Sequence, residues 1–169
     1  MNDSRIRSHW VAGALVAAMG VAAAYASVPK VDVTIQAHKE IVRTDASGKK
    51  ATALAPATEA ASGDVVVYTL HATNTGTGPA MSPRIEDAIP AGTVLVLDSL
   101  AKDGYAIEAS LDGGKSWQAF PVMVTRKNEK GMPESVAAPA ESYTTLRWVL
   151  NGPLQPGDGK DVSFKVRIR

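Results

Sequence analysis

The stretch GDVVVYTLHATNTGTGPAMSPRIEDAIPAG, residues 63–92, decides the fold of this chain. Residues 65–73 are β-branched and aromatic with alternating polarity, and residues 74–79 are rich in the Asn, Gly, Thr and Pro of turns. A second short run at residues 84–88 is closed by a Pro-x-Gly stop. The stretch therefore predicts a strand, a turn and another strand, and it identifies an architecture rather than a reaction.

Strand patterns continue on both sides of this stretch. Residues 31–39, VDVTIQAHK, alternate Val, Val, Ile and Ala against polar residues, which predicts a half-buried strand of an antiparallel sheet. The glycines of Asp112-Gly113-Gly114 supply the positive φ of a tight hairpin turn. Further strands are predicted at residues 93–97, 105–111, 117–125, 143–150 and 160–168.

Two longer segments look like surface loops. Residues 44–62 are heavy in Ala, Thr, Ser and Lys, with one short edge strand expected at residues 51–54, and residues 126–142 are polar with two prolines. Short turn-bounded strands without a sustained helical period predict an all-β, immunoglobulin-like antiparallel β-sandwich. Its aliphatic core is expected to be anchored by three aromatic residues, Trp148, Phe164 and Tyr68.

Residues 1–26 have the pattern of a helical signal peptide. Arginines precede an apolar run at residues 11–24, and Ala24-Tyr25-Ala26 is the small-x-small sequence that a signal peptidase cleaves. We expect residues 27–169 to remain as a single exported domain, periplasmic or extracellular. The alternative is an uncleaved membrane anchor at residues 10–26, which is short for a bilayer span and rich in Ala and Gly.

The amino-acid composition excludes several classes of function. The chain has no cysteine, which excludes disulfides, thiolate metal sites and a cysteine nucleophile. The charges balance, with Lys plus Arg 18 against Asp plus Glu 17, so the chain lacks the basic footprint of nucleic-acid binding. An exported protein without disulfides has to be held together by its core.

The turn residues also carry a resemblance to a known family. Residues 62–169 resemble the bacterial conserved repeat domain, domain of unknown function eleven, in which a strand ending in Asn-x-Gly leads to an Asp-x-x-Pro-x-Gly stop and a Pro-Gly turn precedes the last strand. The resemblance implies an immunoglobulin-like module on the cell surface, usually in tandem copies, whereas this sequence holds one copy. The matching residues are Asn74, Gly76, Asp87, Pro90, Gly92, Pro156 and Gly157.

Few residues suggest catalysis. Residues 110–117, SLDGGKSW, resemble the Asp-box hairpin of sialidase-type propellers, a turn device away from the active site, and we interpret Asp112 as capping the turn and Trp117 as packing beneath it. His38 and His71 are the histidines of the predicted mature chain, and no Gly-x-Ser-x-Gly accompanies them. We therefore predict no catalytic, cofactor-binding or metal-binding residues and no cofactor.

Charged residues near the turns have simpler interpretations. The acidic pairs are expected to be solvated turn carboxylates rather than a calcium site, because the spaced Asp loop is missing; they are Glu86 with Asp87 and Asp158 with Asp161. Four basic residues on the last strand are interpreted as protection against edge-to-edge aggregation, the alternative being contact with an acidic envelope partner. They are Lys160, Lys165, Arg167 and Arg169.

These observations predict a non-enzymatic structural or protein-interaction module of the cell envelope. Its partner is expected to be an envelope or surface protein bound by pairing of strand edges or by the long loops, with no nucleic acid, and with a membrane only if the leader is uncleaved. One alternative is a glycan or small-ligand binder that uses Tyr105, Trp117 and Tyr143 as exposed stacking rings. Another is a hydrolase with His38 or His71 in a cleft.

Overall fold

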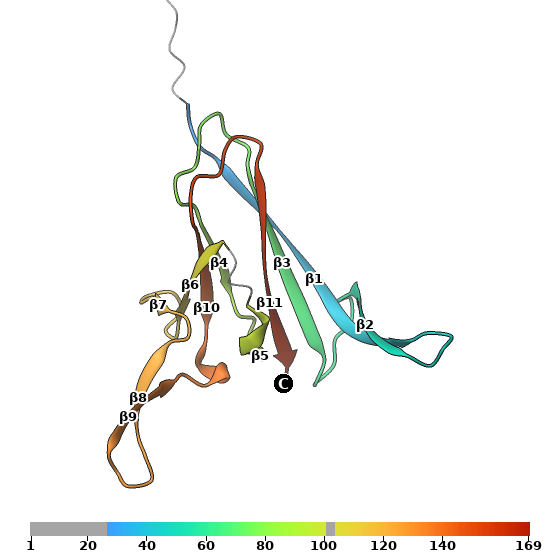
Figure 1. Cartoon of the computed structure of the whole chain (residues 1–169), viewed down its shortest axis with the longest axis vertical. Helices are drawn as coiled ribbons and strands as arrows, with labels where there is room; N and C mark the ends of the chain where they lie inside the picture. The colour runs from blue at the N-terminus through green and yellow to red at the C-terminus, as the bar shows by residue number, and fades with distance from the viewer. Residues whose placement is uncertain (1–26, 101–103) are drawn as a thin grey trace, which may run out of the picture.

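The computed structural model describes residues 27–100 and 104–169, so the predicted signal peptide lies outside the described residues. Within them the chain forms two antiparallel sheets that share one core, and a separate two-stranded hairpin (Figure 1). The predicted all-β antiparallel sandwich is confirmed. This part of the chain contains only short 3-10 turns, Leu97–Ser99 and Ala140–Ser142, and no helix in it is long and apolar enough to cross a membrane.

The first sheet has the strand order β2-β1-β3-β11-β5. Strands β3 and β11 form its centre and pair with each other over most of their length. The inward positions of β11 are Val and Phe, which alternate with polar residues as the period of a strand requires. The bounds are β1 (Val31–Thr44), β2 (Lys50–Pro56), β3 (Val65–Asn74), β5 (Thr93–Leu95) and β11 (Gly159–Ile168).

The second sheet has the order β4-β10-β6-β7. Its last strand is very short, because the chain leaves β6 after two paired residues. The predicted strand at residues 117–125 is therefore wrong as one element: its first part pairs with β6 and its last part belongs to another hairpin. The bounds are β4 (Arg84–Ala88), β6 (Tyr105–Ser110), β7 (Gln118–Ala119) and β10 (Thr145–Leu150).

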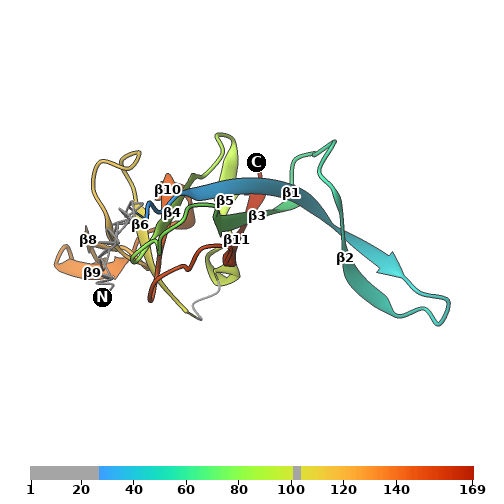
Figure 2. The ribbon, with the colours of Figure 1, turned by 90° about the horizontal axis from the view of Figure 1, so that it is seen from above.

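Two hairpin arms stand where long loops were predicted. Strand β1 continues to Thr44, and β2 returns beside it, so residues 44–62 hold a longer edge strand than expected. Residues 126–142 are not a loop either, because β8 (Met123–Lys127) and β9 (Pro133–Ala137) pair there. The arms project on opposite sides of the sandwich (Figures 1 and 2). Strands that project beyond the core need few large apolar residues, and their sequence therefore resembles a loop.

An aromatic contact joins the two sheets at the centre of the core. Trp148 on β10 and Phe164 on β11 are 1% and 0% exposed, and their ring centroids lie 5.9 Å apart. Tyr68 on β3 stacks on Phe164 with centroids 5.2 Å apart. The predicted aromatic anchors are therefore confirmed, and aliphatic residues from both sheets surround them, including Leu70, Ile85, Leu95, Leu146 and Val166.

The last strand is an edge strand only in part. Strand β11 lies between β3 and β5, but β5 pairs with it only at Val166–Ile168. The interpretation as edge protection is therefore wrong for Arg167 and for Lys165, whose carbonyl accepts from the N–H of Val96. Lys160 lies beyond the reach of β5, so for that residue the interpretation stays a prediction. Lys165 forms an ion pair with Glu40 of β1, and Arg167 donates a hydrogen bond to the carbonyl of Gly63 at 3.1 Å. These side chains tie β11 to segments on the outer side of the first sheet. Strand order is a non-local property that alternation along one strand does not reveal.

Asn74 at the end of β3 links the turns at one end of the sandwich. Its side chain is fully buried, and its Nδ2 donates to the carbonyls of Gly78 and Leu154, each at 2.8 Å. Its backbone N–H donates to the carbonyl of Asp158 at 3.0 Å. One residue thus holds the turn after β3 and the segment that leads into β11.

Replacing Asn74 by Ala should lower the free energy of unfolding by about 2–4 kcal/mol, because the buried carbonyls of Gly78 and Leu154 lose their donors. Urea denaturation followed by tryptophan fluorescence measures the change. The exposed Asn151 is the matched control, and Asn151→Ala should change stability by less than about 0.5 kcal/mol. Equal effects of the two substitutions would contradict the role of Asn74.

Candidate functional site: the open edge of strand β1

Strand β1 is the longest strand with an incomplete set of neighbours. On one side β3 pairs with Val31–Lys39, whereas on the other side β2 pairs only with His38–Thr44. Within the described residues, positions 31–37 therefore have a neighbouring strand on one side only. We call the unpaired side of this segment the open edge of β1; Figure 2 shows β2 beside only the far end of β1.

Hydrogen bonds at both ends of the segment show which backbone groups face the open edge. The carbonyl of Lys30 accepts from Thr75 at 2.8 Å on the β3 side, and the carbonyl of Ala37 accepts from Ala57 at 3.3 Å on the opposite side. Because backbone groups alternate in direction along an antiparallel strand, the odd-numbered residues between them face away from β3. The N–H and C=O groups that point to the open edge belong to Val31, Val33 and Ile35.

The apolar side chains of this segment are also uncovered. Val33 pairs with Ala72 and Ile35 pairs with Leu70, so each pair points to the same face of the sheet. Ala72 and Leu70 are 1% and 0% exposed, whereas Val33 and Ile35 are 43% and 53% exposed. The apolar face of the first sheet is therefore buried at β3 but exposed at the neighbouring strand β1, because the second sheet does not cover Val33 and Ile35. The prediction that β1 buries its apolar face is wrong for these two residues.

The other strand edges are short, charged or bounded by proline. The outer edge of β2 begins at Lys50 and ends at Pro56, and the part of β11 that β5 does not pair with carries Lys160 and Asp161. Strand β5 has three residues and β7 has two, so neither offers a long template. Strand β4 carries Arg84 and Glu86 in its five residues. Natural proteins protect sheet edges with short strands, charges and prolines. Residues 31–37 of β1 contain no Lys, Arg or Pro, and their one charged residue is Asp32.

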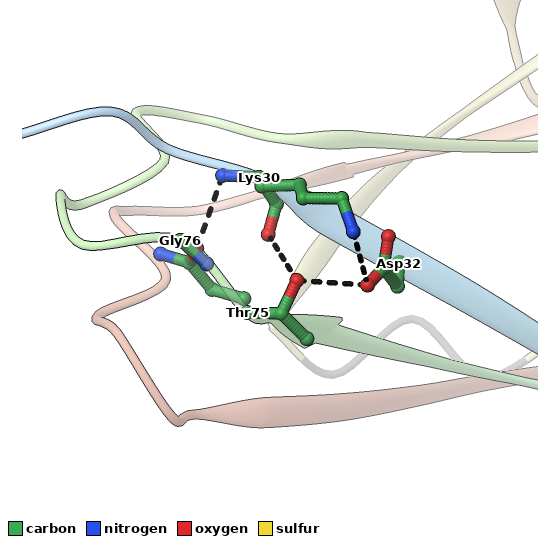
Figure 3. A network of polar contacts seen from close by, with 5 residues as sticks. Lys30, Asp32, Thr75 and Gly76 are labelled. Atoms are coloured by element: carbon green, nitrogen blue, oxygen red, sulfur yellow. Dashed lines mark hydrogen bonds and ion pairs between the residues drawn. The ribbon is translucent and has the colours of Figure 1, made fainter.

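A polar network fixes the start of β1 (Figure 3). The carboxylate of Asp32 accepts from Thr75 Oγ1 at 2.8 Å and from Lys30 Nζ at 3.0 Å, and these hydrogen bonds hold the pKa of Asp32 below its usual value. Asn74 Oδ1 accepts from the backbone N–H of Lys30 at 3.3 Å and of Gly76 at 3.0 Å. The charge of Asp32 is thus engaged within the chain, and the open edge is held in an extended conformation.

The two predicted histidines do not form a joint site. His71 on β3 is exposed and pairs through Nδ1 with the carboxylate of Asp161 on β11. His38 lies on β1 opposite Val67, and Thr34 of β1 lies opposite His71. The two histidines are therefore four strand positions apart, about 13 Å along the sheet. Neither histidine lines the surface hollows beside Arg126, Leu150, Glu40 or Leu97.

The turn at residues 110–117 has the predicted capping geometry. Asp112 Oδ1 accepts from the backbone N–H groups of Ser116 at 2.9 Å and Lys115 at 3.1 Å, and from the hydroxyl of Ser110 at 2.7 Å. Hydrogen bonds, those from Ser116 first, hold the pKa of Asp112 well below its usual value. The interpretation of Asp112 as a turn cap is confirmed.

The aromatic residues predicted to stack on a ligand are not an exposed set. Tyr143 is 3% exposed, and its hydroxyl accepts from the N–H of Val122 at 3.1 Å, so its predicted exposure is wrong. The guanidinium of Arg147 lies 3.7 Å from the ring centroid of Trp117 and covers one face of that ring. Tyr105 is half-buried and donates to a backbone carbonyl of β11 at 2.6 Å.

The acidic pairs are distributed among separate partners. Glu86 accepts from Arg147 at 2.7 Å, while its neighbour Asp87 is half-buried and desolvation raises the pKa of Asp87. Asp161 pairs with His71, and Asp158 is exposed in the preceding turn. Within the described part of the chain no three His, Asp or Glu side chains come together as metal ligands.

No protein-family model, curated protein or solved structure matches this chain. The resemblance to the conserved repeat domain therefore stays a prediction. Among the described residues, the open edge of β1 is the feature that most clearly departs from a self-sufficient sandwich. The sequence predicted the strand and its apolar residues, but it did not predict that the strand lacks a neighbouring strand on one side.

Gly76 allows the close approach that positions β1, and Gly76→Ala tests this. A Cβ at residue 76 would lie 2.3 Å from the carbonyl oxygen of Val28 and 2.4 Å from the nitrogen of Lys30. We expect a loss of about 1–3 kcal/mol of stability from this overlap and faster hydrogen exchange in the first half of β1. Gly92→Ala is the control for the location of the effect: residue 92 has φ +79, so this substitution also lowers stability, but its surroundings are open and hydrogen exchange in the first half of β1 should rise no more than elsewhere. Unchanged exchange in β1 of the Gly76 variant would contradict the prediction.

Proposed function

We propose that this protein is an exported, non-enzymatic interaction module of the cell envelope that binds a protein partner by accepting a strand along the open edge of β1. The single observation that carries the proposal is that unpaired backbone groups and uncovered apolar side chains coincide at Val33 and Ile35. Strand addition satisfies both at once, because main-chain hydrogen bonds supply affinity and alternate side chains supply specificity.

The chemistry of the edge defines the kind of strand that fits. Apolar side chains at every second residue of the partner would lie beside Val33 and Ile35, and polar side chains would lie beside Thr34 on the other face. Such a partner adds a sixth strand to the first sheet over positions 31–35. Beyond them Ala57 already occupies the edge by its bond to Ala37. The expected partner segment is therefore short, extended and alternating.

Export is the first part of the proposal to test. Protein recovered from the cell envelope or the medium should begin at Ser27, because cleavage after Ala26 follows the small-x-small pattern. Mass spectrometry of the purified native protein measures its N-terminus. A protein that retains residues 10–26 and sediments with membranes would instead be a tethered domain.

Replacing Ile35 by Lys should reduce partner binding at least about tenfold, because a charge then faces the apolar positions of the incoming strand. The side chain is 53% exposed, so stability should change by less than about 0.5 kcal/mol. In-cell cross-linking of the exported protein, followed by mass spectrometry, measures the adduct.

Val42→Lys is the matched control for this experiment. Val42 also lies on β1 and is 68% exposed, but it pairs with Thr52 of β2 and lies outside the open edge. The control should retain the adduct seen with the unmodified protein. An adduct that survives Ile35→Lys, or the absence of any adduct, would argue against strand addition at this edge.

A further inference from the structure

We infer that the strand accepted by the open edge of β1 is the same segment of a second copy, so that residues 31–35 of two chains pair antiparallel about a twofold axis at Val33. This inference rests on the proposed function and names the partner. A twofold axis places the same surface on both sides of an interface and runs two identical strand edges antiparallel. The open edge therefore has to be complementary to itself.

The direction of the backbone groups restricts the possible registers. In an antiparallel pair, two residues exchange hydrogen bonds only when both direct their N–H and C=O groups at each other. In β1 these residues are the odd-numbered ones, Val31, Val33 and Ile35 (as the bonds at Lys30 and Ala37 establish). Centring the axis on Val33 places Val31 opposite Ile35 and Val33 opposite Val33, so every unpaired group of the three residues gains a partner.

The neighbouring registers leave the edge less well satisfied. An axis at Asp32 would set the two Asp32 carboxylates directly opposite each other, which is destabilising for like charges. An axis at Thr34 would set Val31 opposite Ala37, whose carbonyl is already bonded to Ala57. The register centred on Val33 avoids both problems and places Asp32 opposite Thr34.

The flanking structure limits the pairing to this short segment. On one side the bond between Ala57 and Ala37 marks the point where β2 takes over the edge. On the other side Pro29 has no N–H, and Val28 is held by Thr77 through bonds of 2.9 and 3.1 Å. The residues on either side of positions 31–35 are therefore not available for pairing with a second copy.

Side-chain packing across the axis gives the dimer an apolar centre. Val33 of each copy would contact Val33 of the other, with Ile35 beside Val31. Val33 and Ile35 are 43% and 53% exposed, whereas Val31 is half-buried against the core. The first sheet of one copy would then continue into the first sheet of the other through the paired β1 strands. In each copy the edge of positions 31–35 would then be paired, which prevents the aggregation to which an unprotected strand edge can lead.

Charge complementation at Val33 tests the axis directly. Val33→Lys and Val33→Glu should each raise the dimer dissociation constant at least about a hundredfold, because two like charges then face each other at the axis. An equimolar mixture of the two variants should recover a dimer, since Lys now faces Glu. Sedimentation equilibrium of the predicted mature chain, residues 27–169, measures all three samples and the unmodified protein. The same pair of substitutions at Val42 is the control and should leave the association of the unmodified protein unchanged.

A cysteine variant supplies a second measurement that does not depend on charge. The chain has no cysteine, so Val33→Cys introduces one thiol per copy. Hydrogen-bonded antiparallel pairs have Cα atoms about 5.5 Å apart, within the range of a disulfide. Mild oxidation should produce a disulfide-linked dimer from Val33→Cys and little from Val42→Cys.

The outcomes separate this inference from the proposed function. A monomeric unmodified protein, or a dimer that both Val33 variants retain, would overturn pairing with a second copy. If an adduct with a different protein is then lost in Ile35→Lys, the proposed strand addition at the open edge is supported, but the added strand belongs to that protein and not to a second copy. If no adduct depends on the open edge, both ideas fail.

Discussion

The buried amide of Asn74 is the interaction on which the arrangement of β1 and β11 depends. Its Nδ2 holds the carbonyls of Gly78 and Leu154, and its Oδ1 holds the N–H groups of Lys30 and Gly76. Hydrogen bonds in a buried site are strong, and each group would be costly to leave unpaired. The start of β1, the turn after β3 and the segment before β11 are therefore fixed by one side chain.

The open edge of β1 follows from this attachment combined with a mismatch between the two sheets. The hydrogen bonds around Asn74 hold the first half of β1 beside β3, while the buried residues of the second sheet pack against β3 and β11. Val33 and Ile35 extend the apolar face one strand farther than this cover reaches. In the function that we propose, a partner strand or a second copy would supply the missing neighbour without any change in the sandwich itself.

Alternation in residues 31–39 was enough to predict a strand and its apolar face, because the side-chain period of a strand is a local property. It was not enough to predict that Val33 and Ile35 are exposed, since exposure depends on which strands lie above and beside them. The two hairpin arms were missed for a related reason. Their strands bury little, so their polar composition resembles that of loops. Tyr143 was misjudged in the opposite direction, because a half-polar ring gives no sign of whether the core will cover it.

The sequence by itself determined where the strands of the core and the turns between them form, because β-branched residues, glycines and prolines restrict the backbone there. It also determined the aromatic centre, since Trp148 and Phe164 are too large and apolar to remain exposed in a small sandwich. Only the tertiary structure decided that β11 lies between β3 and β5 in the strand order, that β2 ends at Pro56 and that an apolar part of β1 has a neighbour on one side only. These properties arise from pairing between residues distant in the chain, and periodicity within a single strand carries no information about them.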